Sequence, residues 1–374
     1  MPPLAQRNLF HDKVRLTVTL TGIVFAVVLI VVELGLFVGF TQTTSNLIDN
    51  SGADLWVTSK NVTYVEQGFP FSERKLYQIR AIPGVADAQK YITHWTGWKR
   101  PDGGQESVQI VGFNPDSSLG KPWNLVEGRV EDVKRPDAVM VDELYKQKLG
   151  VTRVDEVFEI SGHRARVVGF TRGIRAFTTS PYVFTTFKRS QEYANLGEAQ
   201  TIFVLVKIAP GADVQQVRRE ILGGVKDVEV FSSRQFSRMT QFYWMFTTGA
   251  GVAVLLAALL GLVVGFVVVA QTIYATTVDH LKEFGTLKAM GAPNSYVYKV
   301  IIKQAAISAV IGYVLGMIVS GFVVHASQRG GAAILLPWQM AAGMFFLTLA
   351  MCIGAALVSI NKVTRLDPAI VFKG

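Results

Sequence analysis

The sequence predicts an α+β membrane protein, in which four transmembrane helices carry a large mixed α/β extracytoplasmic domain between the first and second helices. Of the 374 residues, 50% are hydrophobic and only 17% are charged. The apolar residues gather in four runs, 16–40, 249–273, 304–324 and 340–360. Each run is long enough to cross about 30 Å of hydrocarbon. The segment between the first two runs instead alternates strand-like and turn-like patterns.

These runs set the expected order of the chain. We expect the first run to be an uncleaved anchor, because it is too long for a signal peptide and no small-residue cleavage site follows it. The predicted parts are a tail at 1–15, helices at 16–40, 247–273, 300–325 and 338–361, an outer domain at 41–246, a polar segment at 274–299, a short outer loop at 326–337 and a tail at 362–374.

Lysine and arginine near the ends of the spans predict the orientation. The positive charges concentrate in the two tails and the polar segment, at Arg7, Lys13, Arg15, Lys282, Lys288, Lys299, Lys362, Arg365 and Lys373. The loop between the third and fourth spans holds only Arg329. We therefore expect a protein of the bacterial inner membrane with both termini in the cytoplasm and residues 41–246 outside.

The outer domain is expected to combine two parts. A short similarity between IRAIPGVADA (79–88) and EILGGVKDVE (220–229) favours a split β-α-β part at about 50–115 and 200–232, although chance is an alternative. A β-rich insert would occupy about 116–199. Its arginines could bind an acidic partner, but alternation along the strands favours a solvated face.

Composition argues against several functional classes. Residues 41–240 carry 26 basic and 23 acidic side chains, so most of the net charge of +9 lies on the inner side, where it suits anionic lipid rather than nucleic acid. No phosphate-binding P-loop, catalytic serine motif or metal-ligand spacing occurs. We expect no catalytic residue, no bound metal and no cofactor on this chain.

The stretch DHLKEFGTLKAMGAP (279–293) is too polar to cross a bilayer and lies between the second and third spans. Leucine and phenylalanine recur every third residue, and Gly291 with Pro293 should end the helix. Such a helix suits a groove on a soluble partner, or alternatively the lipid interface. The candidate partner-contact residues are Asp279, Leu281, Lys282, Glu283, Phe284, Gly285, Leu287, Lys288, Met290 and Gly291.

Two short motifs resemble one protein family. EFGTLKAMGA (283–292) is similar to the E-I-G-x-L-[KR]-A-[LIM]-G-A segment of FtsX-like permeases of ABC systems, the group that includes MacB, LolC/LolE and DevC. RLDPAIVF (365–372) resembles their terminal signature at Asp367 and Pro368, with the alanine displaced to Ala369. Phe284 replaces the usual isoleucine. The layout of spans and GADLWV (52–57) look closest to DevC-type permeases.

This resemblance implies a non-catalytic permease subunit that transmits ATPase-driven motion to the outer domain. The polar segment would be a coupling helix seated on a separate ABC ATPase dimer, which binds ATP and Mg. A second copy of the chain would complete the complex. A periplasmic membrane-fusion adaptor and an outer-membrane channel are expected partners, and the substrate would be lipophilic or periplasmic.

Small and polar residues inside the spans are further candidates. Three G-x-x-x-G pairs suit close helix packing or a dimer interface, namely Gly35 with Gly39, Gly261 with Gly265, and Gly312 with Gly316. Glu33 would either meet a polar partner within the membrane or reach water at the outer interface. The aromatic residues Phe236, Phe242, Tyr243, Trp244 and Phe246 are expected to form an interfacial belt.

Two alternative functions remain open for this sequence. An FtsX-type protein would signal to a cell-wall hydrolase and transport nothing, whereas a LolC/LolE-like protein would extract lipoproteins. The length of the outer segment favours an exporter over the simple signalling type.

Overall fold

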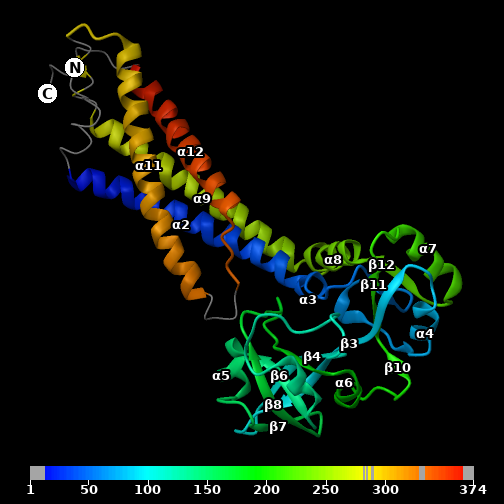
Figure 1. Ribbon diagram of the computed structural model, residues 1–374. Helices are drawn as coiled ribbons and strands as arrows, with labels where there is room; N and C mark the ends of the chain where they lie inside the picture. The colour runs from blue at the N-terminus through cyan, green and yellow to red at the C-terminus, as the bar shows by residue number, and fades with distance from the viewer. Residues whose placement is uncertain (1–12, 281–282, 284, 288–289, 328–332, 365–374) are drawn as a thin grey trace. The chain divides into compact units, whose positions relative to one another are not determined.

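The computed structural model describes residues 13–280, 283, 285–287, 290–327 and 333–364 (Figure 1). The chain divides into two compact units. Among the described residues, one unit is helical and is drawn from 13–38, 253–327 and 334–364, with the gaps given above. The other is the outer domain, drawn from residues 39–252 and residue 333.

Four long helices form the helical unit, and all are long and apolar enough to span a membrane (Figure 1). They are α2 (Lys13–Thr44), α9 (Ala250–Asp279), α11 (Asn294–Ser327) and α12 (Trp338–Thr364). The fold class predicted from the sequence is confirmed. The helix ends differ from the predicted spans, because backbone hydrogen bonding continues past the apolar run into polar residues. α9 also begins at Ala250 rather than at residue 247.

One hydrophobic core holds the bundle together. Ile23, Val27 and Ile30 of α2 are nearly inaccessible to solvent and share this core with residues of α9, α11 and α12. The remaining faces of α9 and α11 expose large apolar side chains such as Leu260 and Phe322, as expected for helices surrounded by lipid.

The outer domain contains a continuous, largely antiparallel sheet with the strand order β12-β1-β11-β3-β4-β9-β6-β8-β5. β7 pairs with both β3 and β8. The strands are β1 (Leu55–Thr58), β3 (Val85–Lys99), β4 (Gln105–Phe113), β5 (Leu125–Glu127), β6 (Ala138–Asp142), β7 (Val157–Ile160), β8 (His163–Thr171), β9 (Tyr182–Thr186), β11 (Phe203–Ile208) and β12 (Glu229–Ser232).

Shorter elements complete this domain. They are α3 (Asn46–Asp49), η1 (Val65–Gln67), β2 (Phe71–Ser72), α4 (Lys75–Arg80), η2 (Val130–Lys134), η3 (Glu143–Tyr145), α5 (Lys146–Leu149), α6 (Phe187–Tyr193), β10 (Gln200–Thr201), α7 (Val214–Gly224), α8 (Ser233–Phe242) and η4 (Tyr243–Thr247). The last of these is a single π-helical turn.

Two pieces of the chain, β1-α4-β3 and β11-α7-β12, each run strand, helix, strand. Their four strands lie side by side in the order β12-β1-β11-β3. Leu76 and Ile79 of α4 share a core with Val217 and Ile221 of α7. The two halves therefore fold as one split unit, although more than a hundred residues separate them in the chain.

The insert is continuous with this unit rather than a separate part. β3 pairs with β11 through its first half and with β4 from Ile92 onward. β4 in turn pairs in parallel with β9, which lies inside the predicted insert. The two parts share one sheet because the long strand β3 runs through both.

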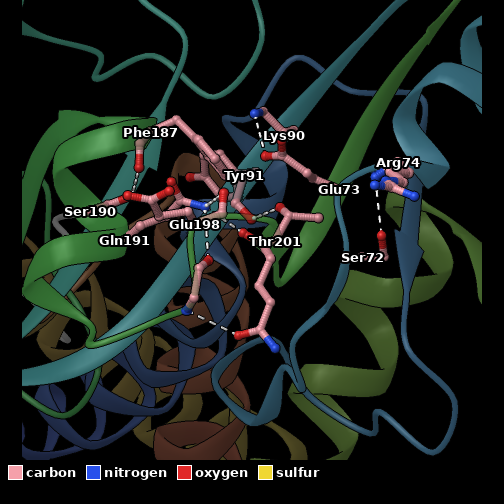
Figure 2. A network of polar contacts seen from close by, with 12 residues as sticks. Ser72, Glu73, Arg74, Lys90, Tyr91, Phe187, Ser190, Gln191, Glu198 and Thr201 are labelled. Atoms are coloured by element: carbon pink, nitrogen blue, oxygen red, sulfur yellow. Dashed lines mark hydrogen bonds and ion pairs between the residues drawn. The ribbon is translucent and has the colours of Figure 1, made fainter.

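A polar network connects the two parts where the chain returns from the insert (Figure 2). Lys90 on β3 pairs with Glu73 at 2.6 Å. The amide of Gln191 on α6 donates to the carbonyls of Glu198 and Gln200 at 3.1 and 2.7 Å. Thr201 donates to the carbonyl of Tyr91 at 3.3 Å. These bonds hold the segment before β11 against β3 and α6.

Candidate functional site

The polar segment between α9 and α11 is the first candidate site. α9 continues as a helix to Asp279, and α11 begins at Asn294. Glu283 and residues 285–287 are also helical. The predicted contact residues Leu281, Lys282, Phe284 and Lys288 lie outside the described residues, as do Asp367 and Pro368 of the C-terminal motif.

The described residues of this segment differ in their exposure. Gly285 is buried, and Leu287 is partly buried against the hydrophobic core of the bundle. Glu283 is exposed, and Met290 is 72% exposed. Glu283 and Met290 are thus among the described residues of this segment that a partner can reach, and we call this pair the exposed coupling surface.

The segment ends as the sequence suggests a helix should end. Gly291 has a φ of 89°, in the left-handed region that glycine adopts without strain. The amide of Ala292 donates to the carbonyl of Leu287 at 3.0 Å. Such a C-terminal turn satisfies carbonyls that the helix leaves open.

Charged groups place the start of α2 beside the end of α9. Arg15 Nε lies 3.8 Å from Asp279 Oδ2, and the hydroxyls of Thr19 and Thr276 are 2.9 Å apart. His280 is buried, and its Nδ1 lies 3.0 Å from Glu283 Oε1. The N-terminal end of α2 and the polar segment therefore lie at the same end of the bundle. Sequence reasoning missed these contacts, although the i,i+3 spacing of His280 and Glu283 is a usable signal.

The glycine pairs of α9 and α11 both lie against α2. A Cβ added at Gly261 or Gly265 would lie 3.0 Å from Glu33 Cγ or 2.9 Å from Ile30 Cδ1. The same addition at Gly312 or Gly316 would come within 2.5 Å of Ile23 or 2.8 Å of Val27. These four glycines thus let two helices approach α2 within one chain.

The pair on α2 itself contacts the segment that precedes α12. A Cβ at Gly35 would lie 2.7 Å from Ile334 Cγ2. A Cβ at Gly39 would lie 1.7 Å from the carbonyl oxygen of Ala333. Backbone, rather than a flexible side chain, limits the space at Gly39.

Glu33 lies partly buried on α2, where the stem of its side chain packs over Gly261 of α9. No hydrogen bond or ion pair joins its carboxylate to any of the residues that the structure describes. Its role stays a prediction.

The aromatic residues before α9 do not form a single belt. Phe236 is fully buried, with its ring 5.4 Å from that of Trp56, because it lies on the face of α8 that packs against the sheet. That part of the prediction is wrong. Tyr243 stacks on Tyr64 at 3.9 Å, whereas Phe242 and Phe246 are 62% and 51% exposed.

A carboxyl group that the sequence did not single out lies beside these rings. The indole of Trp244 donates to Glu66 Oε2 at 3.3 Å. Burial raises the pKa of Glu66 to about 7, while hydrogen bonds from its own backbone and from Trp244 oppose the shift. Glu66 therefore titrates near neutral pH.

The comparison with known families decides the identity. The model of the MacB-like periplasmic core domain matches residues 16–223. The chain belongs to this family. The model of the FtsX-like permease C-terminal region matches residues 255–368, a range that includes most of α9, the polar segment, α11 and α12. This MacB-like chain is an ABC transporter permease of the MacB/FtsX type and a multi-pass membrane protein.

Two sequence relatives of this MacB-like permease align with nearly its whole length. An uncharacterized ABC transporter permease of Mycobacterium tuberculosis is 25% identical over 99% of both chains. The macrolide export ATP-binding/permease protein MacB of Escherichia coli is 21% identical over 98% of this chain and 59% of its own length. Among solved structures, the periplasmic region of MacB from Actinobacillus actinomycetemcomitans covers 52% of this chain with a TM-score of 0.39 and 12% identity.

Proposed function

We propose that this permease is the membrane subunit of an exporter and that it transmits ATPase-driven motion across the membrane. A separate ABC ATPase would bind ATP and Mg and dock on the exposed coupling surface. The observation that carries the proposal is the exposure of Glu283 and Met290 on a helical segment that joins two membrane spans. An exposed apolar side chain and an exposed charge on the same segment, here Met290 and Glu283, suit insertion into a groove of a partner.

The packing of the bundle suits mechanical transmission. Gly285 and Leu287 are held against the bundle, so a force on the segment acts directly on α9 and α11. Both helices touch α2 through glycines that leave little free space. Close-packed helices of this kind move as rigid elements.

The remaining partners are also part of the proposal. A second copy of the chain would match the two subunits of an ATPase dimer. A periplasmic adaptor and an outer-membrane channel would receive a lipophilic or periplasmic substrate. The chain would lie in the bacterial inner membrane with both termini in the cytoplasm. Support for export comes from the name of the Escherichia coli relative, a macrolide export protein.

Substitution of the exposed coupling surface tests this function. In the purified complex with its ATPase, Met290→Asp is expected to weaken ATPase binding by about tenfold or more, because a charge replaces an apolar group at the contact. ATP hydrolysis in the complex should fall to the level of the free ATPase. Binding and hydrolysis are measured on the same preparations.

Two controls make the result specific. Met290→Leu keeps the apolar contact and should retain activity. Leu222→Asp places the same charge on an exposed site of α7 in the outer domain and should also retain it. Normal ATPase binding and stimulation by Met290→Asp would contradict the proposed docking site. Gly285→Trp is a poor probe, because Gly285 is buried in the bundle.

A further inference from the structure

A cavity of about 710 Å³ opens beside α8 in the outer domain. Its walls include Thr63, Met239, Phe242 and Tyr243, and Arg234 and Arg238 also line it. This volume lies in the range of small-molecule sites, which are mostly apolar with a few placed polar groups. Nothing in the coupling mechanism uses this cavity.

Local structure holds the wall of the cavity in place. Ser232 caps α8 by accepting a hydrogen bond from the amide of Gln235 at 3.2 Å. The hydroxyl of Thr240, on the buried face of α8, accepts from the amide of Val65 at 3.2 Å. Tyr64 stacks on Tyr243 at 3.9 Å. These contacts hold Thr63 beside α8, on which Arg234, Arg238 and Phe242 are exposed.

The two arginines are available for an anion. Arg234 and Arg238 are exposed and four residues apart, so their side chains lie on one face of α8. Neither forms an ion pair within the described part of the chain, whereas Arg135 and Arg189 of the same domain pair with aspartates at 2.8 and 2.9 Å. Guanidinium groups bind phosphate with paired hydrogen bonds.

One lining residue of the cavity is close along the chain to the start of a membrane span. Thr247 lines it, and α9 begins at Ala250. An extended chain rises at most about 3.6 Å per residue, so these two residues are within about 11 Å of each other. Phe242 and Phe246, whose rings are 5.0 Å apart, expose apolar surface shortly before this point in the chain.

We propose that this cavity binds an acidic phospholipid of the surrounding membrane leaflet. The headgroup phosphate lies against Arg234 and Arg238, and the first part of an acyl chain lies against Met239 and Phe242. An acidic lipid is favoured over a zwitterionic one, because its headgroup carries no ammonium group to repel the guanidiniums. This site is independent of ATPase docking.

Lipid binding to the full-length chain tests the proposal. Short-chain phosphatidylglycerol and phosphatidylcholine are each titrated, below their micelle concentrations, onto the chain in a non-ionic detergent. Native mass spectrometry then counts the bound lipids. We expect preferential binding of phosphatidylglycerol, and a loss of about tenfold or more in its affinity in R234Q/R238Q, since each basic group near an anionic surface contributes to binding. Binding of phosphatidylcholine should not change.

Matched variants separate this site from general charge effects. R164Q/R219Q removes two exposed arginines that do not line the cavity and should bind as the wild type does. Phe242→Gln should weaken the binding of both lipids. Phe69→Gln, at another exposed phenylalanine, should leave the binding of both unchanged.

Three outcomes would overturn the proposal. Equal binding of the two lipids would show that the site does not select an acidic headgroup. Equal losses of affinity in the two double variants would show that the lipid does not bind in the cavity. Displacement of the lipid by glycerol phosphate at matching concentration would show that the acyl chain does not contribute, and would indicate a site for free phosphate.

Discussion

At the scale of single residues, Glu66 shows how an aromatic environment changes a carboxyl group. The sequence places it in a polar-looking stretch, NVTYVEQ (61–67), with no sign of burial. In the folded domain it lies beside Trp244, and Trp244 also contacts Tyr64 and Phe177 at 5.6 and 4.2 Å between rings. Removal from water disfavours the ionised carboxylate.

The raised pKa of Glu66 predicts a pH dependence of stability. A carboxyl group usually has a pKa near 4.5, and here the pKa is about 7. The folded state therefore binds the proton more tightly, and this contribution to stability is complete below the unfolded pKa and is lost as pH rises through about 7. Glu66→Gln should raise the melting temperature of the outer domain above pH 7 and flatten its decline between about pH 4.5 and 7.

Thermal unfolding of the full chain, followed by near-ultraviolet circular dichroism at several pH values, measures this effect. Glu131→Gln is the control, because Glu131 is exposed and should leave the profile unchanged. Identical profiles for the wild type and Glu66→Gln would show that Glu66 ionises freely in the fold.

At the scale of elements, α9 and α11 both approach α2 closely. Glycines of α9 and α11 lie against α2, and its own Gly35 and Gly39 contact the segment before α12. The G-x-x-x-G pattern in the sequence predicts close packing but does not name the partner helix. The structure supplies a partner for all three pairs within one chain, so a second copy is not needed to explain them.

A bulky residue at Gly312 tests this packing. A Cβ there would lie 2.5 Å from Ile23 Cγ2, so Gly312→Val should destabilise the bundle by about 1–3 kcal/mol through overpacking. Gly321→Val on the same helix is the matched control, because a Cβ at Gly321 meets no atom within 4 Å. Thermal unfolding in detergent compares the two variants. Equal melting temperatures for the two variants would show that α2 and α11 accommodate the added side chain with no loss of stability.

At the scale of the whole molecule, the function requires the polar segment and the outer domain on opposite sides of the membrane. Cys352 is the sole cysteine in the sequence, so Cys352→Ala provides a background for labelling. In intact cells, a membrane-impermeant thiol reagent should label the variant Tyr77→Cys, at a site 65% exposed in the outer domain. The variant Met290→Cys should react only after the inner membrane is opened. Reaction of both in intact cells would refute the topology.

The sequence by itself determined the class of protein, because crossing a hydrocarbon layer demands long apolar helices whatever the rest of the chain does. It also located the polar segment, since a half-charged helix between two spans is a local property. Only the tertiary structure decided which side chains of that segment remain accessible, with Met290 exposed and Leu287 turned to the bundle. Likewise, Arg234 and Glu66 owe their surroundings to contacts with residues distant in the chain, and pattern along a sequence carries no information about such contacts.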